Sequence, residues 1–175
     1  MVLWITGISG SGKTTLGTIF YKNFKKKYIS TIHLDGDVIR NVYGNDIKYT
    51  LKARNTNAER LTKLVKILSS QKINIIITAN LTSLKYRNWC KRNLKNYLEI
   101  YISAKLENLV KRDYKNLYKN ALKKKIKNVV GVDIPFNHPK NSDLYLSNNS
   151  TKKEFLQNIK ILNNLIKNKK IKIYN

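Results

Sequence analysis

Eight residues near the beginning of the chain have the types and spacing of a loop that holds phosphate groups. The segment Gly7–Thr14 reads GISGSGKT and fits the pattern G-x-x-x-x-G-K-[ST] at every fixed position. Its glycines let backbone N–H groups turn inward, Lys13 reaches the β- and γ-phosphates, and the Thr14 hydroxyl ligates Mg²⁺. A full match between an apolar run and an amphipathic segment argues against a chance glycine-rich turn. ATP and Mg²⁺ are therefore the expected cofactors, and the expected nucleotide contacts are Gly7, Ser9, Gly10, Ser11, Gly12, Lys13, Thr14 and Thr15.

Two acids and an arginine form a second cluster, Asp35, Asp37 and Arg40, directly after another apolar run. One carboxylate can hold Mg²⁺, and the other can accept the proton of an acceptor hydroxyl, while the arginine can bind an acceptor phosphate through two hydrogen bonds. Either acid could also cap a following helix, but capping needs only one of them. We expect catalytic roles for Lys13, Asp35 and Asp37, and metal contacts from Thr14 and Asp35.

The phosphate loop alone does not distinguish kinases from GTPases and motor ATPases. The chain has no Asn-Lys-x-Asp sequence for reading guanine, and its 175 residues are few for a motor. The apolar run 73–78 ends without an aspartate, so the usual second magnesium carboxylate is missing from the obvious place. These features favour a small-molecule kinase whose acids lie elsewhere.

The elements that must position these residues alternate between strands and helices. Unbroken apolar runs indicate buried strands, and an apolar period of 3.6 residues indicates helices. The expected strands are 2–6, 30–34, 73–78, 97–102 and 144–146, and the expected helices are 13–27, one from 38, 54–71, 84–94, 106–125 and 151–166. This alternation predicts an α/β fold, a three-layer P-loop kinase sandwich with a mostly parallel five-stranded sheet. Both clusters follow strands directly, so they should meet at the carboxyl ends of the strands, where ligands bind.

The length of the chain suits a single domain over residues 1–175, with a lid of about residues 113–141 that contains both prolines. No apolar run is long enough to cross a bilayer, and the N-terminus has no basic segment or cleavage site, so neither a membrane span nor a signal peptide is expected. The single cysteine, Cys90, cannot form an internal disulfide, which favours a cytoplasmic location. The expected partner is a small-molecule nucleotide substrate. A homodimer is the oligomeric state considered beside a monomer.

The formal net charge of +25 allows two interpretations. A nucleic-acid binder would use such a charge for contacts with phosphates. However, six of the 35 basic residues are arginines, the better readers of phosphates and bases, and the lysines are scattered over many segments. We therefore favour a lysine-rich composition with a site for anionic substrates, and we expect no specific nucleic-acid partner.

The histidines are weaker candidates for chemistry. His33 lies inside an expected strand and is interpreted as a packed core residue. His138 lies in the proline-containing loop and is interpreted as an exposed residue. Two histidines and one cysteine give no convincing zinc site.

The motifs together resemble those of the adenylylsulfate kinase family, whose members phosphorylate the ribose 3′-hydroxyl of adenylylsulfate. The resemblance covers roughly residues 2–147, nearly the whole expected domain. It rests on the loop Gly7–Thr15, Leu34–Arg40, Arg54 with Asn57, Arg112-Asp113 followed by Leu117–Lys119, and Ile126-Lys127 leading to Gly131–Asp133 and Pro135. It implies a P-loop kinase that transfers the γ-phosphate of ATP to a nucleotide.

The resemblance also implies roles for residues on the acceptor side of the site. Asp37 matches the acid that acts as a base or substrate ligand in the family. The matched residues Arg40, Arg54 and Asn57 contact the phosphate and ribose of the substrate. Residues Lys119–Pro135 match a lid that closes over both nucleotides, with one lysine facing the substrate.

The chain departs from the family where the acceptor base is held. The family sandwiches adenine between two phenylalanines, of which one falls on Tyr49, which keeps a stacking face, and the other on Val129, which does not. The family's Phe-Ile-Ser-Pro stretch begins here with Asn80 and has Thr82 in place of the serine. Loss of one aromatic partner removes on the order of 1–3 kcal/mol of base stacking, enough to change the preferred base. The expected substrate contacts are Asp37, Arg40, Tyr49, Arg54, Asn57, Asn80, Lys127 and Val129.

A smaller base would suit such a half-sandwich. The family has a branch that phosphorylates cytidine diphosphoramidate, used in making the phosphoramidate group of some bacterial capsules, and the chain resembles that branch. The leading hypothesis is therefore a 3′-hydroxyl kinase of cytidine diphosphoramidate, and the second is an adenylylsulfate kinase with a changed pocket that makes 3′-phosphoadenylylsulfate. A nucleic-acid-binding ATPase is a remote alternative supported by charge alone, and a scaffold without catalysis is disfavoured by Lys13, Thr14, Asp35 and Asp37. The residues alone indicate only an acceptor other than standard adenylylsulfate.

Overall fold

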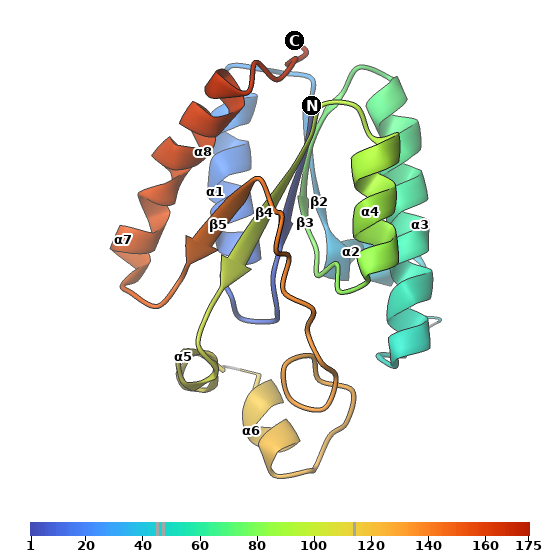
Figure 1. The fold of residues 1–175 in the computed structure, drawn as a ribbon, viewed down its shortest axis with the longest axis vertical. Coiled ribbons are helices and arrows are strands. Elements are labelled where there is room, and N and C mark those ends of the chain that lie inside the picture. Colours follow the sequence, from blue (N-terminus) through green and yellow to red (C-terminus); the bar gives the residue numbers. More distant parts are fainter. Residues whose placement is uncertain (45, 47, 114) are drawn as a thin grey trace.

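The strands form one sheet in the computed structural model, which describes the chain apart from residues 45, 47 and 114. The strands are β1 (Val2–Thr6), β2 (Thr31–Asp35), β3 (Asn74–Thr78), β4 (Tyr97–Ser103) and β5 (Leu144–Ser147). Their order is β2-β3-β1-β4-β5, and each of these neighbouring pairs is parallel (Figure 1). The predicted α/β fold with a five-stranded sheet is confirmed. The order places β1 in the centre, so the loop that follows β1 begins at the middle of the sheet's carboxyl edge.

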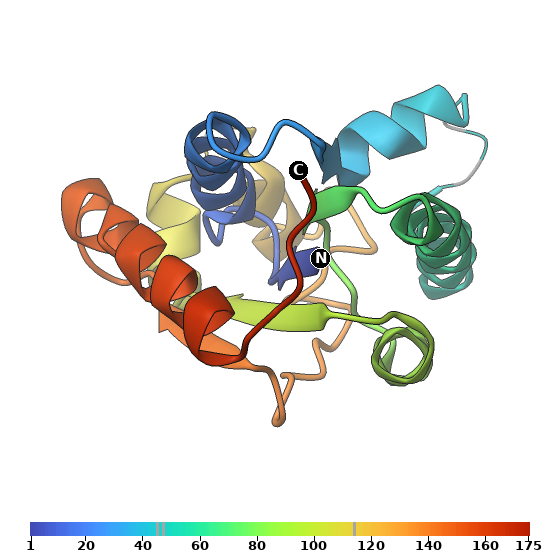
Figure 2. The same ribbon diagram turned by 90° about the horizontal axis from the view of Figure 1, so that it is seen from above.

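Helices cover both faces of the sheet and give three layers, as Figures 1 and 2 show. Helices α1, α7 and α8 cover one face, and α3 and α4 cover the other. Their bounds are α1 Lys13–Lys25, α3 Leu51–Ser70, α4 Leu84–Asn93, α7 Lys152–Leu156 and α8 Asn158–Asn168. Alternate side chains of β1 point to opposite faces of the sheet. Leu3 and Ile5 pack with α1, α7 and α8, and Val2 and Trp4 pack with α3 and α4. The central strand is therefore buried on both faces, which is why its sequence is a continuous apolar run.

The expected helix over 106–125 is wrong, because the structure divides it. Helix α5 spans Leu106–Lys111 and α6 spans Leu117–Leu122. Asn116 has a left-handed backbone with φ 52°, which a continuous helix cannot include. The carboxylate of Asp113 accepts the backbone N–H groups of two residues in α6, at 2.8 and 3.0 Å. Asp113 therefore binds N–H groups at the start of α6, which favours a separate helix over a continuation of α5.

The expected helix over 151–166 is also divided, at Gln157, between α7 and α8. Thr151 caps α7, and its partner in the capping box is Glu154. Two other helices begin earlier than expected: α2 spans Gly36–Val42, and α3 begins at Leu51. No helix in the described part of the chain is long and apolar enough to cross a membrane.

The last residues of the chain lie over the edge of the sheet opposite the phosphate loop (Figure 2). Buried Asn74 of β3 exchanges two hydrogen bonds with Tyr174, one from Nδ2 to the carbonyl oxygen at 2.6 Å and one from the backbone N–H to Oδ1 at 3.0 Å. Ser30 donates to the carbonyl oxygen of Asn175 at 2.6 Å. The C-terminal segment is therefore tied to β3 and to the residue before β2.

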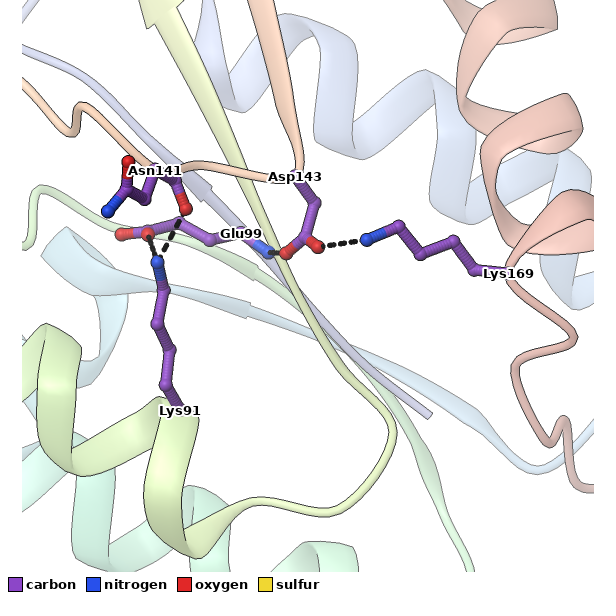
Figure 3. A network of polar contacts seen from close by, with 5 residues as sticks. All are labelled: Lys91, Glu99, Asn141, Asp143 and Lys169. Atoms are coloured by element: carbon purple, nitrogen blue, oxygen red, sulfur yellow. Dashed lines mark hydrogen bonds and ion pairs between the residues drawn. The ribbon is translucent and has the colours of Figure 1, made fainter.

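A polar network ties β4 and β5 to helices on both faces (Figure 3). Lys91 of α4 lies 3.4 Å from Glu99 and donates to the carbonyl oxygen of Asn141 at 2.5 Å. The backbone N–H of Glu99 donates to Asp143 at 2.9 Å, and Asp143 pairs with Lys169 at 2.7 Å. The Glu99 side chain is 1% exposed, and its burial raises its pKa although neighbouring cations oppose the shift. The network fixes the segment that leads from the lid region into β5.

Candidate active site

The phosphate loop connects the end of β1 to the start of α1 at the centre of the sheet's carboxyl edge. Gly12 has a φ of 100°, and a side chain there would lie 2.5 Å from the amide nitrogen of Asn148. At Gly7 a side chain would lie 2.4 Å from the carbonyl oxygen of Ile102. Both positions therefore require glycine, one for its backbone conformation and one for the close approach of β4. Thr14 and Thr15 lie exposed in the first turn of α1, where helix N–H groups have no partner within the helix.

Lys13 folds back over this loop, and its Nζ donates to the carbonyl oxygen of Ile8 at 2.8 Å. Burial lowers the pKa of Lys13 to about 8, and the nearby carboxylates of Asp37 and Asp35 oppose the shift. The ammonium group is thus held in the loop close to both acids without an ion pair at contact distance in the described residues. Such a partly desolvated cation is well placed to bind a phosphate group.

Asp35 is the centre of a compact hydrogen-bond set at the end of β2. Its Oδ2 accepts the hydroxyl of Thr14 at 2.9 Å and the hydroxyl of Thr78 at 2.8 Å, and its Oδ1 accepts the backbone N–H of Asp37 at 3.0 Å. Burial alone would raise the pKa of Asp35, but these bonds and one from the N–H of Val38 lower it below the usual value. The side chain therefore caps α2 and stays a carboxylate next to the phosphate loop, so the capping and functional interpretations hold together.

Asp37 lies exposed in the first turn of α2. Its negative charge acts on Lys13 of the phosphate loop and also on Arg54 of α3, whose pKa is lowered mainly by burial. Asp37 thus lies between the residues assigned to ATP and those assigned to the acceptor. A carboxylate in this position can accept a proton from a hydroxyl that enters between them.

The residues near Thr14 fit a magnesium ion. The Thr14 hydroxyl and the Asp35 carboxylate are 2.9 Å apart, and both are hard oxygen ligands. In the described residues no group of three or more His, Cys, Asp or Glu side chains could hold a metal ion by itself. This suits Mg²⁺, which binds through one or two protein oxygens, water and substrate phosphates instead of a complete protein cage.

Arg40, Tyr49 and Arg54 come together on the acceptor side. The guanidinium carbons of Arg40 and Arg54 lie 4.7 and 5.7 Å from the centre of the Tyr49 ring, which is 54% exposed. Arg54 also donates through Nε to the carbonyl oxygen of Tyr49 at 2.9 Å, and Arg40 donates to that of Lys48 at 3.3 Å. Arg40 is 7% exposed, so its guanidinium group is held against the Tyr49 ring, and that ring remains open to a ligand.

Asn57 lies in α3, and Asn80 follows β3 on the side of the sheet that α3 covers. Asn57 is one turn after Arg54 in α3, and Asn80 follows β3, next to residues that pack in the same apolar cluster as Ala58. The Oδ1 atoms of both asparagines are buried and have no hydrogen-bond partner in the described part of the chain. An unpaired buried acceptor favours a ligand that brings a donor.

The lid segment packs directly on the phosphate loop. Tyr118 donates its hydroxyl to the carbonyl oxygen of Ser9 at 2.7 Å, and Gly131 approaches the side chain of Ile8. Val129 is 4% exposed and packs with Leu109, Tyr118 and others in the lid's own apolar cluster. Its expected role as the second wall of a base pocket stays a prediction. Lys127 is exposed, and its contact with a substrate stays a prediction.

Comparisons with known proteins agree with this geometry. Residues 1–147 match the sequence model of the family described as adenylylsulphate kinase. The chain belongs to the adenylylsulfate kinase family. The cytidine diphosphoramidate kinase of Campylobacter jejuni is 38% identical over 147 residues, which are 84% of this chain and 85% of that protein. A probable adenylyl-sulfate kinase of Pseudomonas aeruginosa is 31% identical over 159 residues, which are 90% of this chain and 74% of that protein.

Solved structures of the adenylylsulfate kinase family share the whole architecture. The APS kinase of Mycobacterium tuberculosis, in complex with AMPPNP and APS, matches with a TM-score of 0.85 at 25% identity, over 95% of this chain and 96% of that one. AMPPNP is an analogue of ATP. The chain is therefore a kinase of this family, and its use of ATP and the roles of individual residues remain predictions.

Sequence reasoning missed two residues that hold this candidate site together. Thr78 is the last residue of β3, the position where an aspartate would usually provide a second magnesium ligand. Its hydroxyl donates to Asp35 at 2.8 Å. Asn148, just after β5, donates to the carbonyl oxygen of Ser11 at 2.9 Å and so supports the phosphate loop. Both are polar residues at the carboxyl end of a parallel strand, and that position was the signal that could have identified them.

Proposed function

We propose that this kinase transfers the γ-phosphate of ATP to the ribose 3′-hydroxyl of cytidine diphosphoramidate, in the synthesis of a capsule phosphoramidate group. The observation that carries the proposal is the Tyr49 ring, which is 54% exposed and has no aromatic ring against it in the described residues. A purine stacked on one aromatic ring gains less binding free energy than a purine clamped between two rings, by roughly 1–3 kcal/mol. A pyrimidine has less face to lose and can be selected by hydrogen bonds to its edge.

The Oδ1 atoms of Asn57 and Asn80, which have no hydrogen-bond partner in the described residues, also support cytidine diphosphoramidate as the substrate. Cytosine and adenine both carry an amino group, but a phosphoramidate adds a P–NH₂ group, so cytidine diphosphoramidate has a further donor at its phosphate end. The sulfate of adenylylsulfate offers only acceptor oxygens. After a rotation of one of these side chains toward the ligand, the P–NH₂ group would donate to an Oδ1 atom that the sulfate would leave unpaired. The 38% identity to the cytidine diphosphoramidate kinase of Campylobacter jejuni adds further support.

In the proposed reaction each charged residue of the site has one task. Lys13 would bind the β- and γ-phosphates of ATP together with the N–H groups of the phosphate loop. Arg40 and Arg54 would hold the acceptor's phosphates and fix its ribose next to the γ-phosphate. Asp37 would accept the proton of the 3′-hydroxyl as that oxygen bonds to phosphorus and the bond to ADP breaks. The lid residues above Ser9 would exclude water from the transferred group.

Thr14 and Asp35 would hold Mg²⁺ next to the phosphates. The ion would supply positive charge that neutralises the phosphate oxygens during transfer. The four hydrogen bonds that Asp35 accepts keep it ionised and oriented for that contact. Thr14 is free to turn its hydroxyl lone pairs toward the ion, because its proton already points to Asp35 at 2.9 Å.

Adenylylsulfate is the alternative acceptor, and the relative from Pseudomonas aeruginosa favours it. The two substrates can be compared directly in a coupled ATP-consumption assay with each acceptor at the same Mg·ATP concentration. A 3′-deoxy form of the better acceptor serves as a control for the position of transfer, because it lacks the attacking hydroxyl. A higher kcat/KM for adenylylsulfate would contradict the proposed acceptor, and turnover of the 3′-deoxy form would contradict the 3′ position.

A homodimer and a cytoplasmic location stay predictions. Light scattering would test the first, and cell fractionation would test the second.

A further inference from the structure

His33 lies behind the candidate active site and contacts it through one intermediate residue. It precedes Asp35 by two positions in β2, so both side chains are on the same face of that strand. Asp35 is the register partner of Thr78 in the neighbouring strand β3. The Nε2 of His33 lies 3.0 Å from the Thr78 hydroxyl, and that hydroxyl lies 2.8 Å from Asp35 Oδ2. A continuous polar line therefore runs from His33 to the carboxylate that faces the phosphate loop.

The direction of this line follows from the protons that each group can give. An ionised carboxylate can only accept, so the single hydroxyl proton of Thr78 must point to Asp35. The Thr78 oxygen can then only accept from His33, so the imidazole must carry a proton on Nε2. Either charge state of the ring meets this requirement. A donor at Nε2 thus commits the Thr78 proton to Asp35, whereas an acceptor there would compete for it.

The packing of α1 holds these groups in place. A side chain on Gly17 would lie 2.2 Å from the Thr78 methyl group and 3.5 Å from His33 Nε2. The ring of Tyr21, one turn further along α1, lies 5.6 Å from the imidazole at 31°. The same helix carries Thr14, whose hydroxyl is the second donor to Asp35 Oδ2 at 2.9 Å. The helix that forms part of the phosphate site therefore also closes the space around His33.

We propose that His33 is a positioning residue that fixes the Asp35 carboxylate for magnesium binding, through the oriented hydroxyl of Thr78. The proposal rests on the proposed role of Asp35 as a magnesium ligand. Without the donor, the Thr78 oxygen loses one of its two hydrogen bonds, so the hydroxyl that Asp35 Oδ2 accepts is held less firmly in place. The carboxylate then samples more orientations, so Mg²⁺ binds the ATP complex less tightly. The strand position that sequence reasoning assigned to core packing would in this way act on the site.

The test is ATP binding by calorimetry, measured once with Mg²⁺ and once with EDTA. Replacement His33→Leu removes the donor and keeps an apolar side chain, and we expect it to weaken binding with Mg²⁺ by about 3–10-fold, the loss of one hydrogen bond, with little change in EDTA. His33→Gln is the matched control, because its terminal amide can place an N–H near the position of Nε2, and it should keep binding close to wild type. Thr78→Val should match His33→Leu, and the double variant should lose little more than either one.

Three results would contradict the proposal or its basis, and they differ. Equal weakening with Mg²⁺ and with EDTA in His33→Leu would mean a general structural effect, which thermal unfolding of each variant would also detect. Magnesium dependence like that of wild type in a folded His33→Leu would overturn the positioning role. An Asp35→Asn variant with unchanged magnesium dependence would instead contradict Asp35 as a metal ligand. The acceptor is not part of the measurement, so a wrong acceptor assignment would leave the result intact.

Discussion

The guanidinium group of Arg54 donates to the backbone carbonyl oxygen of Asn128 at 2.8 Å and so joins α3 to the lid. The same group holds the carbonyl oxygen of Tyr49 through Nε at 2.9 Å. Burial lowers the pKa of Arg54, and the nearby charge of Arg40 lowers it further, so two cations lie close together on the acceptor side. An anionic acceptor would relieve this repulsion, because it brings negative charge to both groups. Arg54 therefore links the lid to the residues that are expected to bind the acceptor.

The first prediction concerns this connection. We expect Arg54→Ala to lower kcat/KM for the acceptor by about 10–100-fold, the loss of one or two hydrogen bonds to a charged group, with little change in KM for ATP. Hydrogen exchange in residues 119–135 should become faster in the same variant. Arg60→Ala is the control, since Arg60 lies in the same helix but pairs with Asp46 at an exposed position. Equal losses in both variants would argue against a specific role of Arg54.

The sequence predicted well what depends on local pattern and motif. The five strands lie within about one residue of their predicted bounds because buried parallel strands need continuous apolar runs, as in β3. The phosphate loop and the acids after β2 meet at one edge because parallel topology brings strand ends together. The division at Asn116 was not predicted, because a single left-handed residue within a lysine-rich amphipathic segment leaves the apolar period unchanged. The packing of Val129 in the lid cluster was not predicted either, since it depends on how the lid folds on itself.

A second prediction is that Lys13→Ala abolishes activity and leaves the protein folded. Lys13 is the cation of the phosphate loop, so its loss removes stabilisation of the phosphates during transfer. Lys22→Ala is the matched control, because Lys22 is an exposed lysine of the same helix and should keep wild-type turnover. Near-normal turnover of a folded Lys13→Ala protein would contradict the assignment of the loop.

The same variant also has an expected pH dependence of stability. Burial lowers the pKa of Lys13 to about 8, below the value of 10.5 in an unfolded chain. Between these values the unfolded wild-type chain binds more protons, so wild-type stability rises with pH over this range while the variant lacks that contribution. Any gain in the melting temperature of Lys13→Ala over wild type should therefore be largest near neutral pH and decrease as the pH rises through this window.

A third prediction separates catalysis from binding at Asp37. We expect Asp37→Asn to lower kcat by about 10²–10⁴-fold, the usual contribution of a general base, with a much smaller change in ATP affinity. The asparagine keeps the shape of the side chain and the start of α2, whose N-cap is Asp35 and not Asp37. Calorimetry with ATP and steady-state kinetics on the same preparation give the two quantities. A variant with weak ATP binding and an unchanged maximal rate would assign Asp37 to the nucleotide instead.

A fourth prediction concerns the buried acid in the network of Figure 3, Glu99. Burial raises the pKa of Glu99 above its unfolded value, so its ionised form destabilises the folded state at neutral pH. We expect Glu99→Gln to raise the melting temperature near pH 7 by on the order of 2–4 °C, the change for about 1 kcal/mol in a domain of this size. Lys91 would lose its charged partner, but it keeps its hydrogen bond to Asn141, and its side chain is 36% exposed and can be solvated.

The sign of this effect has a clear pH dependence. Below the unfolded pKa, glutamate is protonated in both states, so the advantage of the glutamine should disappear as the pH falls through about 4.5. Glu107→Gln, at an exposed position in the first turn of α5, should show no comparable gain at neutral pH. A stability loss in Glu99→Gln at pH 7 would mean that the ion pair with Lys91 outweighs the burial of the charge.

The candidate site was harder to predict than the fold, and His33 shows why. A histidine within an apolar strand usually packs in the core, and nothing in the sequence says which residue of the neighbouring strand lies beside it. The register that pairs Asp35 with Thr78 is a tertiary property, set by how β2 and β3 align. Sequence motifs therefore indicated the residues expected to contact substrates, while the residues proposed to orient them required the structure.

The last prediction concerns the choice of base. Enlarging Val129 to phenylalanine would not restore a second stacking face, because this side chain is 4% exposed in the lid cluster, and a larger group there would strain the packing. The test belongs at Tyr49, whose ring is open to solvent. We expect wild type to have the higher kcat/KM for cytidine diphosphoramidate, Tyr49→Phe to keep that value, and Tyr49→Leu to lower it by about 5–100-fold.

Adenylylsulfate should lose more than the cytidine substrate in Tyr49→Leu, because a purine has the larger face to lose and no second aromatic ring to replace it. The ratio of the two kcat/KM values should therefore move further toward cytidine in Tyr49→Leu and stay near wild type in Tyr49→Phe. Equal losses for both acceptors would mean that Tyr49 shapes the pocket without selecting the base. A wild-type preference for adenylylsulfate would overturn the substrate assignment, but the proposed transfer by Lys13, Asp37 and the magnesium ligands would stand, since none of these residues is assigned to the base.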